Sequence, residues 1–436
     1  MKNGEEYPRV LVFGQGFNTH SGGGVTLINL FKGWPKDKLA SIVTNYKHVS
    51  VNEVCENVFG LSRWNPFLSL ISCKQYTAPS VQEVLNNRYV FEANINKTNR
   101  SPLPKSLKIV EKLGILPLLH NNKVPEALIR WIKEFNPDII YTQLADLNVA
   151  IMVYDLSIIL RVPIALHIMD DWPRTIYTKG IFSIIFRWRM EKYFQRLINK
   201  STILMGISEA MCIEYQKRYI REFVSFHNPI EINKWLNYQK NDWRLYDKVT
   251  ILYMGRFGLV TKESLNDLVD VISGLNVEGN NINLKIVTPD FNEQLKKQIE
   301  VDHNIELLPS VANDKVPELL IGADILFLPL DFGNEAIDFI RYSMPTKSTE
   351  YMISGVPILI YAPNNVALTN YAHDKKWAIV VDVRSKNQLK QAIIDLMKDE
   401  KLRKSLGQRA IELSIKKHDA TIVREEFRKT LFNGTN

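Results

Sequence analysis

Residues 345–357, with the sequence PTKSTEYMISGVP, combine polar side chains with the start and stop signals of one short helix. Pro345 suits the first turn of a helix, and Gly355 suits its end. The apolar run at residues 356–361 then predicts a buried strand. The segment therefore presents a helix start in front of a strand of an α/β domain.

The polar side chains of this helix start suit a phosphorylated, hydroxylated ligand. The N–H groups of Thr346 and Ser348 would face the space ahead of the helix, where its dipole favours an anion. Glu350, one turn into the helix, can accept hydrogen bonds from hydroxyls. A phosphate beside a diol describes the ribose-diphosphate part of a nucleotide-sugar, which is the ligand class that this segment predicts.

Two cations follow an expected strand at residues 250–254. Arg256 comes directly after Gly255, and Lys262 lies six residues later, where the next helix begins. Arginine binds phosphate oxygens with two hydrogen bonds, and lysine supplies a compact charge. The pair predicts a diphosphate site, with a solvated basic turn as the alternative.

A glycine-rich segment follows the first expected strand. Gly22, Gly23 and Gly24 stand where a helix should begin, and their missing side chains would let a ligand approach the backbone. The spacing departs from G-x-G-x-x-G, and no acidic residue follows at the usual offset. A plain strand-to-helix turn is therefore an equal alternative.

One histidine stands at a chemically interesting place. His167 lies near the end of an apolar strand expected at residues 164–168, and such strand ends line ligand crevices in parallel α/β sheets. Asp170 and Asp171 follow it and resemble a metal-binding pair. The alternative is a buried core histidine, which is the commoner situation for a lone histidine in a strand.

Strands and helices alternate along nearly the whole chain, which predicts α/β architecture with parallel sheets. In the first half we expect strands at residues 9–13, 139–142, 164–168, 202–207 and 223–227. The helices expected between them are residues 25–32, 125–135, 148–160, 181–199 and 208–218. In the second half the expected strands are residues 250–254, 283–287, 324–328, 357–361 and 378–381.

The chain of 436 residues is long enough for two domains. The predicted division is an N-terminal domain, a linker, a C-terminal donor-side domain and a final helix that packs back on the first domain. An irregular insertion at about residues 47–122 could be an acceptor site or a loop with small packing helices. The boundaries of the four parts are residues 1–228, 229–248, 249–414 and 415–436.

Composition restricts the compartment and the partners. The formal charge of +8 fits anionic partners such as a nucleotide or a membrane surface, and no nucleic-acid-binding motif is visible. Three widely spaced cysteines and the absence of a signal peptide or spanning segment predict a cytoplasmic protein.

The helix expected at residues 181–199 carries Arg189, Lys192 and Arg196 on one face. Such a basic face could associate with the inner face of an anionic membrane. The alternative is a core helix with a solvated basic face.

Together these residues resemble those of the retaining GT-B glycosyltransferases of the bacterial family 4 type. The resemblance covers the layout of nearly the whole chain, but its specific residues are few. It implies a GT-B fold, in which two doubly wound Rossmann-like domains face each other across a cleft. It also implies catalysis without a bound metal or cofactor, so Asp170 and Asp171 are not expected to hold a metal.

The resemblance assigns roles residue by residue. His167 would contact the donor sugar near its reacting carbon, and Arg256 and Lys262 would hold the diphosphate. The early glycines would line the cleft. Val311 matches a small residue beneath the nucleotide base, with a buried core valine as the alternative.

Many relatives carry two glutamates seven residues apart in the donor motif. Glu350 matches the second glutamate, whereas Tyr342 stands in the place of the first, where it can hydrogen-bond a sugar hydroxyl. The donor-binding residues expected in this segment are Tyr342, Ser343, Thr346, Lys347, Ser348 and Glu350.

The sequence thus predicts a glycosyltransferase that moves a sugar from a nucleoside-diphosphate donor to a hydroxyl of a glycan or lipid-linked acceptor, with retention, in cell-envelope polysaccharide or glycoconjugate synthesis. One alternative is a sugar-nucleotide 2-epimerase of the same fold. Another is a non-catalytic module that binds a nucleotide-sugar or a membrane.

Overall fold

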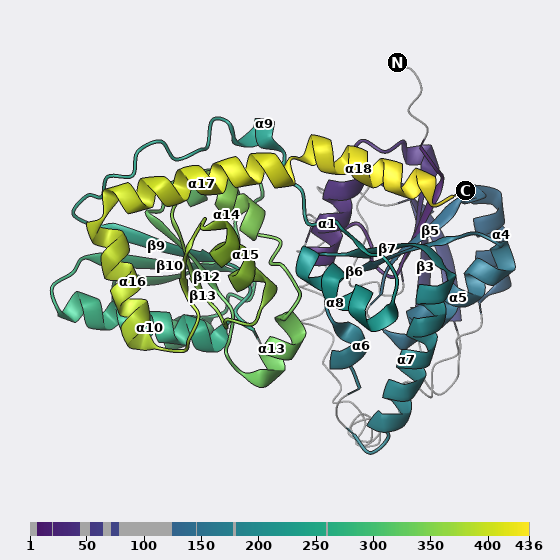
Figure 1. Ribbon diagram of the computed structural model, residues 1–436, viewed down its shortest axis with the longest axis horizontal. Helices are drawn as coiled ribbons and strands as arrows, with labels where there is room; N and C mark the ends of the chain where they lie inside the picture. The colour runs from purple at the N-terminus through teal and green to yellow at the C-terminus, as the bar shows by residue number, and fades with distance from the viewer. Residues whose placement is uncertain are drawn as a thin grey trace. The chain divides into compact units, whose positions relative to one another are not determined.

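The computed structural model divides the chain into two compact units (Figure 1). Unit 1 comprises Met1–Asn228 together with Arg424–Asn436, and unit 2 comprises Pro229–Val423. Most of the insertion expected at residues 47–122 lies outside the part of the chain that the structure describes. The described residues are 7–19, 21–43, 53–63, 71–77, 124–144, 146–177, 180–258 and 260–435.

Unit 1 contains an eight-stranded sheet in the order β4-β3-β2-β1-β5-β6-β7-β8. All neighbouring strands are parallel except β3 and β4, which pair antiparallel at one edge. The strands are β1 Val10–Phe13, β2 Leu39–Val43, β3 Asn57–Arg63, β4 Ile71–Thr77, β5 Ile139–Gln143, β6 Ile164–Ile168, β7 Ser201–Gly206 and β8 Val224–Ser225.

Three helices of unit 1 begin at polar caps placed just after the strands. Ser21, Asp146 and Ser208 each accept backbone N–H groups at a helix start, as expected for N-cap residues. The helices and the 3-10 turn are α1 Gly22–Phe31, η1 Lys36–Lys38, α4 Glu126–Phe135, α5 Leu147–Leu160, α6 Trp172–Thr175, α7 Ser183–Lys200 and α8 Glu209–Tyr219.

Unit 2 contains a fully parallel six-stranded sheet in the order β11-β10-β9-β12-β13-β14. The order reverses direction between β9 and β12, and crevices for ligands lie at such points, beyond the carboxyl ends of the strands. The strands are β9 Val249–Met254, β10 Ile282–Thr288, β11 Ile305–Pro309, β12 Ile325–Pro329, β13 Ile358–Tyr361 and β14 Ile379–Val381.

The helices of unit 2 cover both faces of this sheet, because right-handed crossovers in opposite directions place their helices on opposite faces. On one face α10 packs against α16, and on the other α14 packs against α12 and α17 (Figure 1). The helices are α9 Ile232–Trp235, α10 Lys262–Val277, α11 Glu293–Ile299, α12 Val316–Ile321, α13 Asn334–Ile340, α14 Ser348–Ser354, α15 Ala367–Lys375, α16 Lys386–Lys398 and α17 Glu400–His418.

The last helix, α18 (Ala420–Asn433), brings the end of the chain back into unit 1. Phe427 is fully buried there, and its ring meets the rings of Phe31, Tyr141 and Phe226 edge to face at 5.0–5.8 Å. This aromatic cluster joins α18 to α1 and to strand β5, so the core of unit 1 is built from both ends of the sequence.

Residues 229–248, expected as a linker, pack as part of unit 2. The backbone N–H of Lys240 donates to Ser354 O at 2.7 Å, and the indole of Trp243 donates to Gly355 O at 2.9 Å. Both acceptors are carbonyls at the C-terminal end of α14. The segment therefore fixes the end of the helix that begins at the predicted donor motif.

Candidate donor site

Helix α14 begins later than the sequence suggests. Pro345 lies three residues before its first residue, Ser348, and Lys347 occupies the N-cap position. Both the backbone N–H and the hydroxyl of Ser348 donate to Pro345 O, at 3.0 and 2.7 Å. The expectation that Ser348 leaves a free N–H for an anion is therefore wrong, because the turn before the helix already uses it. Gly355, in contrast, ends the helix as expected, with φ +71°.

The positive charge of this segment comes from a lysine side chain and not from the N–H groups at the start of α14. Lys347 Nζ donates to Met254 O at 2.8 Å, which places its ammonium group at the carboxyl end of β9. Burial lowers the pKa of Lys347 to about 8, and Arg256 lowers it while Glu350 raises it. Burial raises the pKa of Glu350, against the opposing effect of Lys347. The three ionisable groups thus interact at one strand end.

Helix α14 is held against β9 by a buried tyrosine. The Met254 N–H donates to Tyr351 Oη at 2.8 Å, and the Tyr351 side chain is fully buried. Because Tyr351 follows Glu350 directly, this hydrogen bond fixes the turn that carries the carboxylate. Tyr351 was not among the predicted site residues, although a tyrosine next to a predicted ligand-binding carboxylate is a usable signal.

The turn after β9 has a fixed backbone and an exposed cation. Tyr253 Oη and Thr261 Oγ1 both donate to Arg256 O, at 2.7 and 2.8 Å. The Arg256 side chain remains 68% exposed, and its nearest carboxylate is Asp290, at 3.5 Å. A Cβ at Gly255 would lie 2.2 Å from Tyr253 Oη, so this position requires glycine. The backbone is rigid, whereas the guanidinium can reach a ligand.

A second exposed cation and a buried carboxylate lie at the start of α10; the cation belongs to the helix and the carboxylate to the segment after β12. Lys262 is the exposed first residue of the helix. Asp331, just after β12, accepts the backbone N–H groups of Glu263 and Ser264 at 3.2 and 2.8 Å. Burial raises the pKa of Asp331, and these hydrogen bonds oppose the shift. Since Asp331 occupies the helix terminus, the site available to an anion here is the Lys262 side chain. Asp331 was not among the predicted site residues, although its place as a carboxylate at a strand end beside the switch point is a signal in the sequence.

Tyr342 and Ser343 lie between α13 and α14 and are half-buried. Ser343 donates from its backbone to Ile340 O at 3.0 Å, which continues the last turn of α13. Val311 follows β11 and is 36% exposed, so its alternative assignment as a buried core valine is wrong.

The predicted glycine segment of unit 1 is explained by packing within the protein. A Cβ at Gly24 would lie 2.5 Å from the Asn18 side chain, and one at Gly23 would lie 3.0 Å from Gln143 Oε1. Gly22 is the exposed first residue of α1. Side chains of unit 1 therefore fill the space beside Gly23 and Gly24 in which a ligand was expected to approach the backbone.

His167 is a core residue in this structure. Its side chain is fully buried, and Nδ1 lies 2.7 Å from Tyr141 Oη, which accepts a hydrogen bond from Gln143 Nε2 at 3.0 Å. The Tyr141 hydroxyl thus joins His167 and Gln143 in one buried hydrogen-bond chain. Burial lowers the pKa of His167 to about 3, so the ring is neutral. The structure favours the core alternative over contact with a sugar.

The acidic pair after His167 includes a structural ion pair. Asp171 is buried and receives two hydrogen bonds from the Arg218 guanidinium, at 2.8 and 2.9 Å, and one from Tyr215 Oη at 2.7 Å. Over the described ranges, no group of three or more His, Cys, Asp or Glu side chains could hold a metal ion. Asp171 thus anchors α8 to the end of β6.

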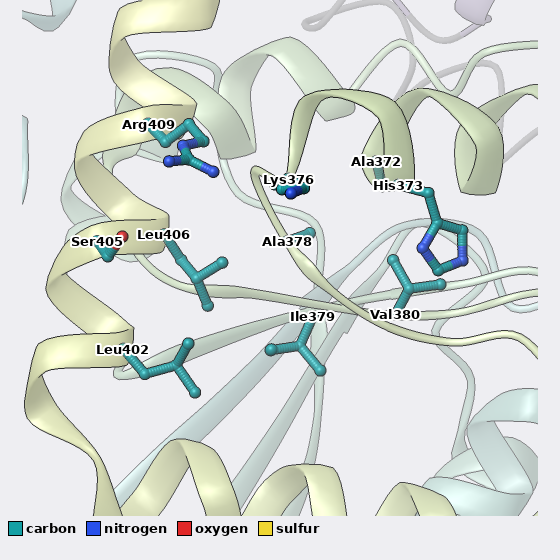
Figure 2. Close-up of a pocket in the computed structure, with 10 residues that line it drawn as sticks. All are labelled: Ala372, His373, Lys376, Ala378, Ile379, Val380, Leu402, Ser405, Leu406 and Arg409. Carbon is teal, nitrogen blue, oxygen red and sulfur yellow. The ribbon is translucent and has the colours of Figure 1, made fainter.

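A pocket of about 460 Å³ lies elsewhere in unit 2, between α15, β14 and α17 (Figure 2). Its wall carries the polar side chains of Arg409, Lys376 and Ser405 and the apolar side chains of Leu402, Leu406 and Ile379. None of the predicted site residues lines it, so it is separate from the cation cluster at β9.

Comparison with known proteins found a family match in unit 2, which contains Arg256, Lys262, Lys347 and Glu350. Residues 237–413, all within unit 2, match the family model described as "Glycosyl transferases group 1". No curated protein matches the sequence.

The whole chain resembles several solved structures. HepE of Anabaena in complex with UDP-glucose has a TM-score of 0.60 and 12% identity, over 98% of this chain and 100% of that one. Sucrose-phosphate synthase of Thermosynechococcus elongatus has a TM-score of 0.62 and 11% identity, over 97% and 98%. A glycosyltransferase of Rickettsia africae has a TM-score of 0.57 and 13% identity, over 97% and 98%. The chain therefore has the α/β GT-B fold, and part of unit 2 resembles the glycosyl transferases group 1 family.

Proposed function

We propose that this protein is a glycosyltransferase that moves a sugar from a nucleoside-diphosphate donor to a hydroxyl of a glycan or lipid-linked acceptor in cell-envelope polysaccharide or glycoconjugate synthesis. The observation that carries the proposal is the convergence of Lys347, Glu350 and Arg256 at the carboxyl end of β9. The match of residues 237–413 to the glycosyl transferases group 1 model supports it. The complex of HepE with UDP-glucose supports this choice of donor class.

In the proposed donor complex, the cations of unit 2 bind the diphosphate. Arg256 has an exposed guanidinium on a fixed backbone, and Lys262 has an exposed ammonium at the start of α10. Lys347 supplies a third, partly buried positive charge, which interacts with both Arg256 and Glu350. Glu350 accepts hydrogen bonds from the ribose hydroxyls, which is the role that a carboxylate can perform beside a diphosphate.

The proposed reaction retains the configuration of the sugar. The bond between the anomeric carbon and the diphosphate oxygen breaks, and the acceptor oxygen bonds to that carbon on the same face. The departing diphosphate oxygen takes the proton of the acceptor hydroxyl. Arg256, Lys262 and Lys347 stabilise the negative charge that develops on the leaving group, without a metal ion or other cofactor. His167 has no part in this scheme, because its ring is buried in unit 1.

Calorimetry with UDP and GDP in the presence of EDTA tests the donor site. We expect one of the two nucleotides to bind, and Arg256→Ala to weaken that binding by about tenfold or more. Arg409→Ala is the matched control, because it removes an exposed guanidinium of unit 2 at the separate pocket. Binding of neither nucleotide, or equal losses in both variants, would reject the assignment of the site.

Product analysis with the nucleotide-sugar that binds separates the proposed reaction from its alternatives. Transfer to an acceptor from a cell-envelope lipid or glycan extract supports the glycosyltransferase. Epimerised donor without an acceptor would indicate the 2-epimerase, and binding without turnover would indicate a non-catalytic module.

A further inference from the structure

Helix α7 is longer than the strands on which it packs. Its 18 residues span about 27 Å, whereas β6 and β7, with five and six residues, span roughly 16–20 Å. The N-terminal end of α7 therefore extends past the sheet of unit 1, as Figure 1 shows. This end lies on the side of the sheet that the carboxyl ends of the parallel strands face, because crossover helices run antiparallel to those strands.

The projecting end of α7 carries four large apolar side chains in water. Ile181, Ile184, Ile185 and Trp188, which we call the apolar tip, are 76%, 80%, 51% and 62% exposed. Ile181 lies in the turn just before the helix, and the spacing of Ile184, Ile185 and Trp188 places these three on one face of it. The core-facing residues of α7 are different: Phe186, Met190, Phe194, Leu197 and Ile198.

The apolar tip adjoins one of the three cations named on this helix, Arg189, Lys192 and Arg196. Lys192 is exposed, and its Nζ lies 5.0 Å from the centre of the Trp188 ring. Arg187, on the same end of the helix, is also exposed. Residues 180–190 contain no Asp or Glu.

We infer that the apolar tip, together with Arg187 and Lys192, binds unit 1 to an anionic lipid surface. Apolar side chains that project from the end of a helix can enter the boundary between headgroups and acyl chains, where tryptophan is favoured. The adjoining Arg187 and Lys192 match the negative charge of such a surface, and they outnumber Glu191, the one acidic residue of α7, which is half-buried. Within the described residues, no helix is long and apolar enough to cross a membrane.

The inference rests on the proposed function in one respect, because a lipid-linked acceptor gives a reason for an enzyme to sit on a membrane. A surface contact at the tip would bring unit 1 to the plane in which such an acceptor lies. The contact itself requires no nucleotide, so the two proposals can fail separately.

Sedimentation with vesicles tests the inference. We expect the protein to bind vesicles of phosphatidylcholine mixed with phosphatidylglycerol and to bind vesicles of phosphatidylcholine alone about tenfold less tightly. The double variant Ile184→Ser with Trp188→Ser should weaken binding to the anionic vesicles by about tenfold or more. The matched control is Leu236→Ser with Val277→Ser, which makes the same kind of change at exposed positions of unit 2.

The charge contribution has its own pair of variants. Arg187→Glu with Lys192→Glu should weaken binding by about tenfold, and added salt should weaken binding of the unaltered protein. Lys297→Glu with Lys404→Glu makes the same charge change at exposed positions of unit 2 and should bind like the unaltered protein. Melting temperatures of all variants establish that they are folded.

Three results would overturn the inference: no vesicle binding, equal binding to both vesicle types, or tip variants that bind as well as their controls. Self-association in solution that the tip variants abolish, without vesicle binding, would instead identify the tip as a contact between copies of this chain. Nucleotide binding is measured on the same preparations, so a protein that binds vesicles but no nucleotide would reject the proposed function and keep this inference.

Discussion

Lys347 is the residue whose chemistry the structure changes most. Its pKa is lowered to about 8, chiefly by burial, so its charge is sensitive to pH just above neutrality. A bound diphosphate stabilises the charged form, so binding should take up a proton where the free lysine is partly neutral. We therefore expect the affinity for the nucleotide at the proposed site to depend on pH through this side chain.

We predict that the affinity for the nucleoside diphosphate falls as the pH rises from about 7 to about 9. The loss should approach tenfold per pH unit above a pKa of about 8, because only the protonated lysine binds the anion well. The phosphate groups ionise lower, at a pKa of about 6, and contribute little to this slope. Calorimetry across this range measures it. Lys347→Met should bind more weakly and lose the slope, and an unchanged slope would contradict the assignment.

Glu350→Ala should weaken nucleotide binding by about 1.5–3 kcal/mol, because the ribose diol loses a charged hydrogen-bond partner. The unaltered protein should also bind the 2′-deoxynucleotide more weakly than the ribonucleotide. The variant should not distinguish the two sugars. A folded variant that still prefers the ribonucleotide would show that another group holds the ribose.

At the scale of elements, His167 joins strands β5 and β6 through its hydrogen bond to Tyr141. Because its folded pKa of about 3 lies below its usual value of 6.5, the unfolded state binds more protons at mildly acidic pH. The stabilisation is fully present above pH 6.5 and is lost as the pH falls from there toward 3. Acidification should therefore destabilise unit 1 through this residue.

We predict that His167→Phe reduces the loss of stability of unit 1 between pH 6.5 and pH 5, compared with the unaltered protein. At neutral pH the substitution should lower the free energy of unfolding by about 1–3 kcal/mol, because Tyr141 Oη loses its hydrogen bond to the buried His167. Urea unfolding at the two pH values measures both effects. His303→Phe is the control, since His303 is exposed. If His167→Phe instead abolished turnover at full stability, a catalytic role would return.

The sequence predicted most elements of the two sheets, but not all of them. Strands β1 and β5–β8 and those from β9 onward were found, except β11, because most of them are apolar runs bounded by turn signals. Strands β2, β3, β4 and β11 were missed. β3 and β4 fall in the stretch whose irregular composition indicated an insertion.

Some of the site residues could be predicted from local sequence, whereas the environment of others depends on tertiary contacts. Glu350 and Gly355 follow from local helix signals, and Arg256 follows from its place after a strand. The bonded N–H of Ser348 and the core position of His167 depend on tertiary contacts, which the local pattern does not contain. The exposed face of α7 depends on the difference in length between a helix and its strands.

At the scale of the molecule, unit 1 depends on the end of the chain. Phe427→Ala should destabilise unit 1 by about 3–5 kcal/mol, because it leaves a cavity among fully buried rings. Calorimetry should show a lower transition for unit 1 and an unchanged transition for unit 2. Ile422→Ala, at an exposed position of the same helix, is the control. Equal shifts in both transitions would indicate that the two units unfold together.

The return of α18 to unit 1 also sets an order of events during synthesis. Phe31 and Tyr141 leave the ribosome early, but their partner Phe427 follows only after all of Pro229–Val423 has been made. At synthesis rates of about 5–20 residues per second, this delay is roughly 10–40 s. Throughout it, the nascent first unit exposes an aromatic surface, while the second unit has its complete sequence before the first. We therefore expect the growing chain to need a chaperone on its earlier half until its last helix emerges.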